Sequence, residues 1–179
     1  IFNDAPAIFP IGDTPVEFTV TDAAGNKADG VTLVTVTGIA QKGRSEKGPL
    51  FGATVFFDYD GDKELDANEP STLTDINGDY ELVETSNAPD DYLVVLLMNE
   101  STIDGITGES YADSGVTLEA VKGAEVITPM TTLYSTAVNG LDEGEELSVE
   151  AFATAIGLPE GVDVNTYSAF AKDEAGEYI

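Results

Sequence analysis

Residues 58–69 form the stretch whose residue types and spacing could do chemistry. Its sequence is DYDGDKELDANE, with carboxylates at the first, third, fifth, ninth and twelfth positions: Asp58, Asp60, Asp62, Asp66 and Glu69. Glu64, at the seventh position, can offer a backbone carbonyl. This is the ligand spacing of a calcium-binding loop, in which the last residue closes the site as a bidentate ligand. Because carboxylates crowded together repel one another unless a divalent cation neutralises them, we predict a Ca²⁺ site here.

One residue of this loop departs from the usual pattern. The sharp turn normally falls on glycine at the sixth position, but Lys63 stands there and Gly61 lies two residues earlier. A positive φ at a lysine costs on the order of 1 kcal/mol, so Lys63→Gly is predicted to be neutral or to tighten calcium binding. The alternative interpretation of the whole stretch is an acidic, solvated loop in an acidic protein.

Other carboxylate groups are weaker candidates. Asp75, Asn77 and Asp79 could bind a second ion, but the Asp-x-Asn-Gly pattern is mostly turn chemistry. Residues 142–146 precede an expected helix and are interpreted as a solvated loop. Pairs of carboxylates could hydrolyse glycosides, but the sequence identifies no acid with a raised pKa and a second carboxylate at the right separation. The chain also lacks tryptophan, which could form a platform for stacking sugars. The sequence therefore predicts a protein that is not an enzyme.

Composition narrows the class of protein further. The chain has 179 residues with no Cys, His or Trp, which excludes disulfides, thiol nucleophiles, His-based triads and ordinary zinc sites. The net charge of −27 argues against binding to nucleic acid or to an anionic membrane. The longest apolar run, residues 92–98, is too short to cross a bilayer. Since the sequence begins at Ile1 and not at a methionine, we expect a piece of a longer protein. The Cys-free, carboxylate-rich composition is typical of a secreted protein, in which charge maintains solubility.

The elements expected to position the acidic loop are mainly strands. Residues 41–49 are predicted as a polar loop, and residues 22–26 and 74–78 as turns. The run 92–98 is near-continuously apolar, which is typical of a strand buried on both faces. The expected strands are residues 16–20, 31–36, 53–57, 80–83, 92–98, 116–120 and 125–127.

After residue 127 the pattern changes to helical. Thr128 and Pro129 predict the start of a helix that ends near Val138. Ser148 predicts the cap of a second helix, with Val149, Phe152, Ala153 and Ile156 on one face. A third helix is expected from Thr166, with Tyr167, Phe170 and Ala171 facing inward. Short helices are marginal alone, so Leu133, Phe152 and Ile156 are expected to dock this segment on the sandwich.

Three stretches resemble modules of very large secreted bacterial adhesins. FPIG (9–12) and VEFTVTDAAGN (16–26) resemble the end of an immunoglobulin-like hyalin repeat. GATVFFD (52–58), the acidic loop through Pro70 and TDINGDY (74–80) are similar to carboxypeptidase-regulatory-like sandwiches and to calcium-binding B-type repeats of staphylococcal adhesins. VITPMTTL (126–133) and IGLPEGVD (156–163) resemble a segment that follows such sandwiches. The resemblance implies calcium at Asp58, Asp60, Asp62, Asp66 and Glu69.

These observations predict a mainly β protein in three parts. Residues 1–38 would be a partial immunoglobulin-like module, 39–127 an immunoglobulin-like or prealbumin-like β-sandwich that binds calcium, and 128–179 a helical cap. The expected function is a non-catalytic structural or adhesive module, extracellular or on the cell surface. Two alternatives stay open: a filament subunit that exchanges strands, and a calcium-dependent module that binds carbohydrate or peptide. Its partners would be neighbouring modules or identical subunits joined by β-strand pairing, or a surface glycan or protein.

Overall fold

The computed structural model describes residues 2–6, 12–36, 38, 40–112, 114–142 and 144–168. It is mainly β, as predicted, with two helices among the described residues. The chain divides into two compact units, residues 1–39 and residues 40–179. The predicted sandwich and the predicted helical cap thus lie in the same unit.

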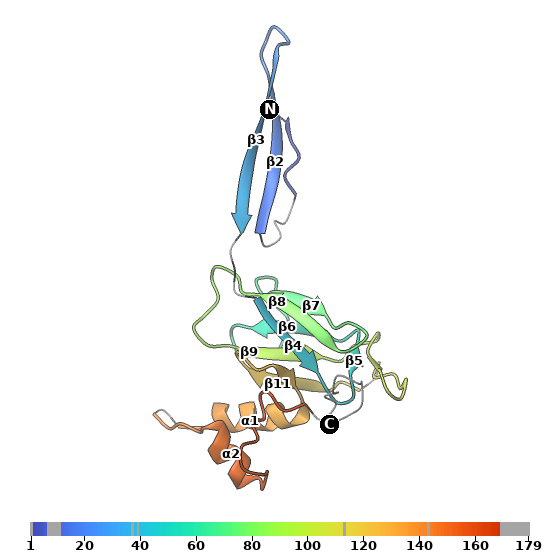
Figure 1. Ribbon diagram of the computed structural model, residues 1–179, viewed down its shortest axis with the longest axis vertical. Coiled ribbons are helices and arrows are strands. Elements are labelled where there is room, and N and C mark those ends of the chain that lie inside the picture. The colour runs from blue at the N-terminus through green and yellow to red at the C-terminus, as the bar shows by residue number, and fades with distance from the viewer. Residues whose placement is uncertain are drawn as a thin grey trace. The chain divides into compact units, whose positions relative to one another are not determined.

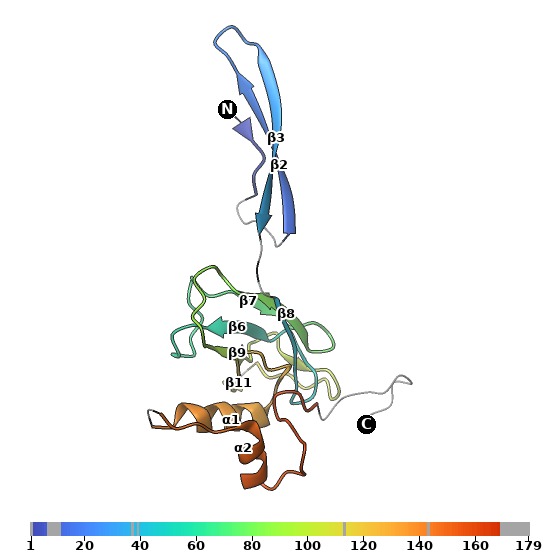
Figure 2. The same cartoon turned by 60° about the vertical axis from the view of Figure 1, so that its left-hand side comes forward.

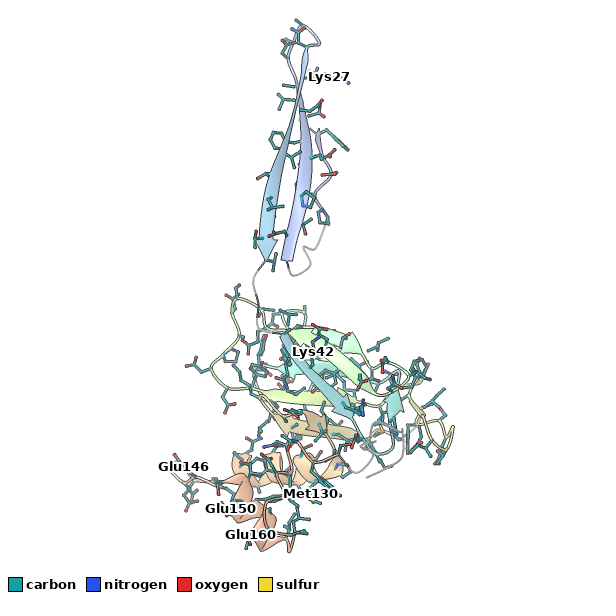
Figure 3. The ribbon with its side chains drawn as sticks, in the orientation of Figure 1. Lys27, Lys42, Met130, Glu146, Glu150 and Glu160 are labelled. Carbon is teal, nitrogen blue, oxygen red and sulfur yellow. The ribbon has the colours of Figure 1, made fainter. Side chains whose placement is uncertain are left out.

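The first unit is a three-stranded antiparallel sheet in the order β1-β2-β3 (Figure 1). Its strands are β1 (Phe2–Asn3), β2 (Gly12–Thr21) and β3 (Lys27–Val36). The expected turn between β2 and β3 is present, and Lys27 follows it at the tip (Figure 3). The Asp22 carboxylate accepts hydrogen bonds from the Asn26 side chain and from the backbone N–H groups of Ala24 and Asn26. The Asn26 bonds hold the pKa of Asp22 below its ordinary value.

The second unit contains two larger sheets and one short strand pair. The first sheet has the order β11-β9-β6-β7, the second has the order β12-β4-β8, and β10 pairs with β5. All these pairings are antiparallel except that of β12 with β4. The strands are β4 (Ala40–Ser45), β5 (Leu50–Phe51), β6 (Thr54–Asp58), β7 (Ser71–Leu73), β8 (Asp79–Val83), β9 (Leu93–Leu97), β10 (Ile103–Asp104), β11 (Thr117–Val121) and β12 (Val126–Ile127).

The main core of this unit lies between the two larger sheets. Phe57, Val94 and Leu118 point into it from the first sheet, while Leu82 and Ile127 point into it from the second. Alternate residues of β9 face the other way, where Val95 packs with Phe56. The prediction that residues 92–98 form a strand buried on both faces is therefore confirmed. Two packed sheets are the architecture of a β-sandwich.

The prediction of a polar loop over residues 41–49 was wrong. Residues up to Ser45 form β4, the central strand of its sheet, and only the four residues that follow make a tight turn. The strand lacks large apolar side chains because its neighbours fill the space. A Cβ at Gly43 would lie 2.4 Å from the Tyr80 hydroxyl oxygen, so the tyrosine ring occupies that place in the core. Tertiary packing has overridden the local sequence pattern here.

Helix α1 (Pro129–Asn139) lies against β11, on the outer side of the four-stranded sheet (Figure 2). Thr128 caps it, as the sequence indicated, and the cap is a capping box with Thr131. The expected inward position of Leu133 was wrong, because this side chain is 58% exposed. The buried residues of α1 are Thr131, Tyr134 and Ser135, two of which carry aliphatic hydroxyls rather than apolar side chains. The reason is a buried carboxylate beneath them, described below.

Helix α2 (Val149–Ala155) begins at the predicted Ser148 cap and buries Phe152 and Ala153. Phe152 packs against Tyr134 of α1 and Val164, whereas Ile156 is 42% exposed, in contrast to its expected inward position. The acidic side chain of Glu150 lies on this helix, and those of Glu146 and Glu160 lie on the segments before and after it (Figure 3). The third helix is not formed at its expected start. Residues 164–166 make a turn on the backbone carbonyl of Asp163, and Tyr167 is exposed, in contrast to its expected inward position. The other two predicted inward residues, Phe170 and Ala171, lie outside the described residues.

Candidate metal centre

The acidic loop connects β6 to β7, two neighbouring strands of the four-stranded sheet. Asp58 is the last residue of β6, and Glu69 precedes β7 by two positions. The Phe57 N–H donates to the Pro70 carbonyl at 3.2 Å, which closes the base of the loop. Strand pairing therefore brings the first and last carboxylates of the loop together, as its spacing predicted.

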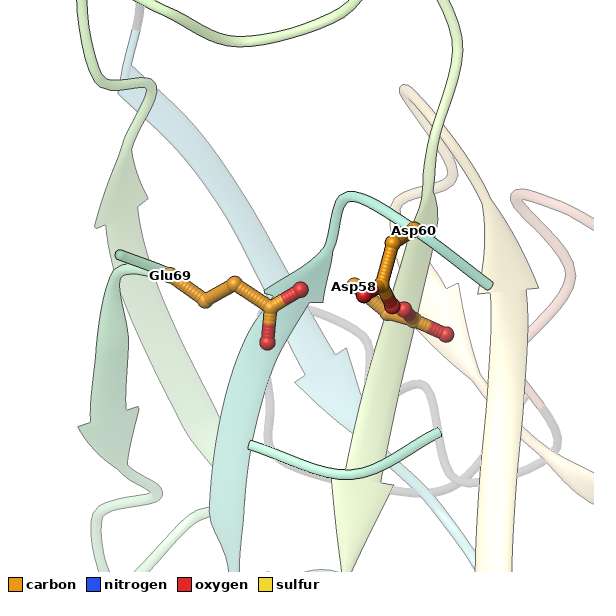
Figure 4. Close-up of side chains that lie close together, drawn as sticks. All are labelled: Asp58, Asp60 and Glu69. Carbon is orange, nitrogen blue, oxygen red and sulfur yellow. The ribbon is translucent and has the colours of Figure 1, made fainter. Parts of the chain in front are cut away.

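Three carboxylates converge at this base. Oxygen atoms of Asp58, Asp60 and Glu69 all lie within 4.8 Å of one another. Figure 4 shows Glu69 reaching from one arm of the loop toward Asp58 and Asp60 on the other. Asp58 and Glu69 are only 1% and 8% exposed, while Asp60 lies at the surface.

Backbone N–H groups hold the two buried carboxylates in place. Asp58 accepts from Gly61 at 2.8 Å and from Lys63 at 3.1 Å. Glu69 accepts from Tyr59 at 2.7 Å with one oxygen and from Asp66 at 3.0 Å with the other. These bonds wrap the loop around its own acidic groups, and each oxygen retains capacity for a further partner.

Within the described part of the chain, the three carboxylates make no ion pair with a lysine or arginine. Burying charged groups without a counter-charge is unfavourable, and neighbouring carboxylates repel one another. An all-oxygen donor set suits a hard cation such as Ca²⁺ or Mg²⁺. The residues present therefore fit a divalent cation, with Asp58, Asp60 and Glu69 as its carboxylate ligands.

The other three predicted ligands do not join this group. Asp62, Glu64 and Asp66 are exposed and lie outside the set of converging carboxylates. Asp62 accepts a hydrogen bond from the Glu64 N–H at 2.7 Å, and the Asp66 carbonyl accepts one from Glu69 at 3.1 Å. They thus shape the loop, and their part in binding a metal stays a prediction.

Lys63 has a second role that the sequence did not indicate. Its φ is +64°, the left-handed conformation expected for the sixth position. Its side chain leaves the loop, and the ammonium lies 2.6 Å from Oε2 of Glu119 on β11. Glu119 is 2% exposed, so this is an ion pair with a buried carboxylate. The sequence signal for this ion pair was Glu119, a single acidic residue within the mostly apolar strand β11. No spacing rule, however, identifies Lys63 as its partner, because the two residues lie far apart in the chain.

Glu119 also explains the hydroxyl-rich face of α1. Its Oε1 accepts hydrogen bonds from Ser135 at 2.6 Å and from Thr136 at 3.2 Å. The Thr131 hydroxyl donates to the Glu119 backbone carbonyl at 2.9 Å. Buried charged groups need such partners, so the helix presents donors where an apolar stripe was expected. The acidic loop, β11 and α1 are joined through this one carboxylate.

A cavity of about 440 Å³ adjoins the candidate centre. Asp58, Asp60 and Asp91 line it, together with Val138 and Asn139 at the end of α1. The C-terminal end of a helix carries partial negative charge, so it adds to the potential of the three carboxylates. Lys63 also lines the cavity, but its ammonium is paired with Glu119, so the remaining charged groups favour cations.

The second candidate ion site has the structure of a turn. Asp75 accepts from the N–H groups of Asn77 and Asp79, as in the turn that the sequence predicted. Asp79 binds Arg44 through two hydrogen bonds of 2.6 and 3.2 Å. Among the described residues, only Asp58, Asp60 and Glu69 form a group of converging metal-ligand atoms.

No family model, curated protein or solved structure matches this chain. The described residues contain no helix that is both long enough and apolar enough to pass through a membrane.

Proposed function

We propose that this chain is a non-catalytic structural module of an extracellular adhesin or filament, stabilised by Ca²⁺ bound at Asp58, Asp60 and Glu69. The observation that supports it best is the convergence of three carboxylates at the closed base of a loop between two sheet strands. The two-sheet architecture is compatible with an immunoglobulin-like or prealbumin-like sandwich. The resemblance of residues 52–80 to calcium-binding adhesin repeats leads to the same function.

Calcium would act in this module as a structural ligand. Asp58 and Glu69 stand at the two ends of the loop, so one ion would join the end of β6 to the start of β7. Only the folded chain holds these carboxylates together, which means that calcium stabilises the folded state by mass action. At free calcium about 100 times the dissociation constant, the gain is roughly 2.7 kcal/mol.

Thermal melting with and without calcium tests this proposal. We expect the melting temperature of the second unit to be higher in millimolar Ca²⁺ than in excess EGTA. The double variant Asp58→Asn, Asp60→Asn should lose most of this difference, because both residues lose charge at the converging site. Glu100→Gln, which removes one charge at an exposed residue outside the loop, is the control and should keep it. Equal melting temperatures in calcium and EGTA would refute the proposal.

A second candidate function is subunit assembly through the first unit. Phe2, Val31 and Leu33 are 74%, 66% and 57% exposed, and the strand register places all three on the same face of the sheet. The outer edge of β3 pairs with no strand of the described residues. A free edge beside exposed apolar side chains favours pairing with another β-strand.

Size-exclusion chromatography with light scattering tests this second function. We expect concentration-dependent oligomers that dissociate in the variant Val31→Lys, because a lysine on an edge strand opposes pairing. Ile106→Lys introduces the same charge at another exposed apolar residue, which lies in the second unit, and should leave assembly unchanged. A monomer at all concentrations, with slow amide exchange in β2 and β3, would contradict it.

A further inference from the structure

A second candidate site lies along β4 and β8 of the three-stranded sheet and extends to β7, the strand that follows the acidic loop. A groove of about 940 Å³ follows the outer face of β4 and β8. It is lined by Lys42 and Arg44 of β4, by Thr72 and Leu73 of β7, and by Thr166 and Ser168. Lys42 marks this face in Figure 3. Its volume is within the range of ligand sites in proteins.

A buried carboxylate with an unused oxygen lines this groove. Glu46, which directly follows β4, is 2% exposed. Its Oε1 accepts a hydrogen bond from the Ser168 hydroxyl at 2.5 Å, whereas Oε2 has no hydrogen-bond donor in the described structure. Buried polar atoms in proteins are nearly always paired, so an orphaned carboxylate oxygen indicates a position for a donor.

The charge balance of the groove shows which donor would suit it. Its two cations are already paired on the outer face, Lys42 with Glu81 at 3.2 Å and Arg44 with Asp79 at 2.6 Å. Glu46, Asp75 and Glu125 also line the groove, and none of the three forms an ion pair within the described ranges. The groove therefore carries an excess of negative charge and favours a cationic ligand.

The spacing of these acids favours an organic cation over a metal ion. Their oxygens do not form a converging group of the kind seen at Asp58, Asp60 and Glu69. A single small ion could not contact all three. An elongated ligand that carries one or more ammonium or guanidinium groups could place a donor at Glu46 and still lie near the other carboxylates.

We propose that this groove binds an alkylammonium or guanidinium group, which donates to Oε2 of Glu46 while Asp75 and Glu125 supply long-range attraction. Two sources share this chemistry: a lysine or arginine side chain of a partner protein, and a free polyamine. The edge position of β8, whose residues Asp79 and Glu81 line the groove, would also allow an extended peptide to pair with its backbone.

Titration of the full chain, followed by amide NMR shifts in excess EGTA, tests this site independently of calcium. The probes are spermidine and a blocked pentapeptide with two lysines, and the same peptide with acetylated lysines is the ligand control. We expect saturable shifts at Glu46 and Ser168 with a cationic probe and none with the acetylated peptide. Binding of the peptide alone would identify a protein source, and binding of spermidine alone a polyamine.

Two variants separate a binding role of Glu46 from a structural one. Glu46→Gln should weaken binding about tenfold, because a hydrogen bond to a charged acceptor is lost. Glu125→Gln, at an exposed residue of the groove, should weaken it to a smaller extent and keeps the test valid if the first variant unfolds. Glu100→Gln changes the net charge equally outside the groove and should have no effect. Absence of saturable shifts with both cationic probes, or affinities unchanged in both groove variants, would overturn the proposal.

Discussion

The ion pair between Lys63 and Glu119 leads to a prediction that can be measured as a coupling energy. In Lys63→Met, the buried Glu119 carboxylate keeps its bonds from Ser135 and Thr136 but loses its counter-charge. Removing one partner of a fully buried ion pair costs about 3–5 kcal/mol. Lys63 is 46% exposed, so solvent already screens its ammonium and the expected loss is about 1–2 kcal/mol.

A double-mutant cycle isolates this pair from other effects. Glu119→Gln retains an oxygen acceptor for the hydroxyls of α1 while removing the buried charge, so Lys63→Met should cost little in that background. The coupling energy is then about 1–2 kcal/mol. Lys63→Gly should lose up to about 1 kcal/mol less than Lys63→Met, because glycine relieves the positive φ. Lys63→Gly is therefore expected to cost about 0–2 kcal/mol of stability without calcium, while its neutral or tightening effect on calcium binding stays a prediction.

Denaturant unfolding in excess EGTA, followed by tyrosine fluorescence, is a suitable assay. All seven tyrosines lie in residues 40–179, so the signal reports on the second unit alone. The control cycle pairs Lys42→Met with Glu81→Gln, an exposed ion pair that should show a coupling of only about 0.2–1 kcal/mol. A coupling between Lys63 and Glu119 below about 0.3 kcal/mol, the usual error of additivity, would refute the structural role of the pair.

Two further predictions concern the stability of the second unit. Gly43→Ala should destabilise it by about 1–3 kcal/mol in the same denaturation assay, since the new Cβ would lie 2.4 Å from the Tyr80 hydroxyl and force the ring to move. Hydrogen bonds from Lys122 and then from the Tyr92 hydroxyl hold the pKa of Glu84 below its ordinary value. The stability due to Glu84 is therefore complete above its unfolded pKa of about 4.3 and is lost as pH falls through the lower folded pKa. Glu84→Gln should flatten the acid limb of a stability profile measured against pH, and an unchanged slope would contradict this cause.

Much of the local structure could be predicted from the residues alone. The turns at 22–26 and 74–78, the caps at Thr128 and Ser148 and the buried strand β9 depend on neighbours in the chain, so their patterns identified them. The acidic loop belongs to the same class. The loop joins two neighbouring paired strands, β6 and β7. The spacing of its carboxylates already indicated that Asp58 and Glu69 come together.

Other features depended on contacts between distant segments. Strand β4 has no strand-like pattern, but it pairs with β8 and β12, and Tyr80 of β8 fills the space above Gly43. The inward face of α1 consists largely of hydroxyl-bearing residues because Glu119 is buried beneath it. Local sequence patterns reflect the conformational preferences of the backbone and of single side chains. The partners of a buried charge, in contrast, are residues that are distant in the sequence and become neighbours only in the folded structure. For that reason the sequence determined where the acidic loop lies, and only the tertiary structure decided that Lys63 joins it to the helix.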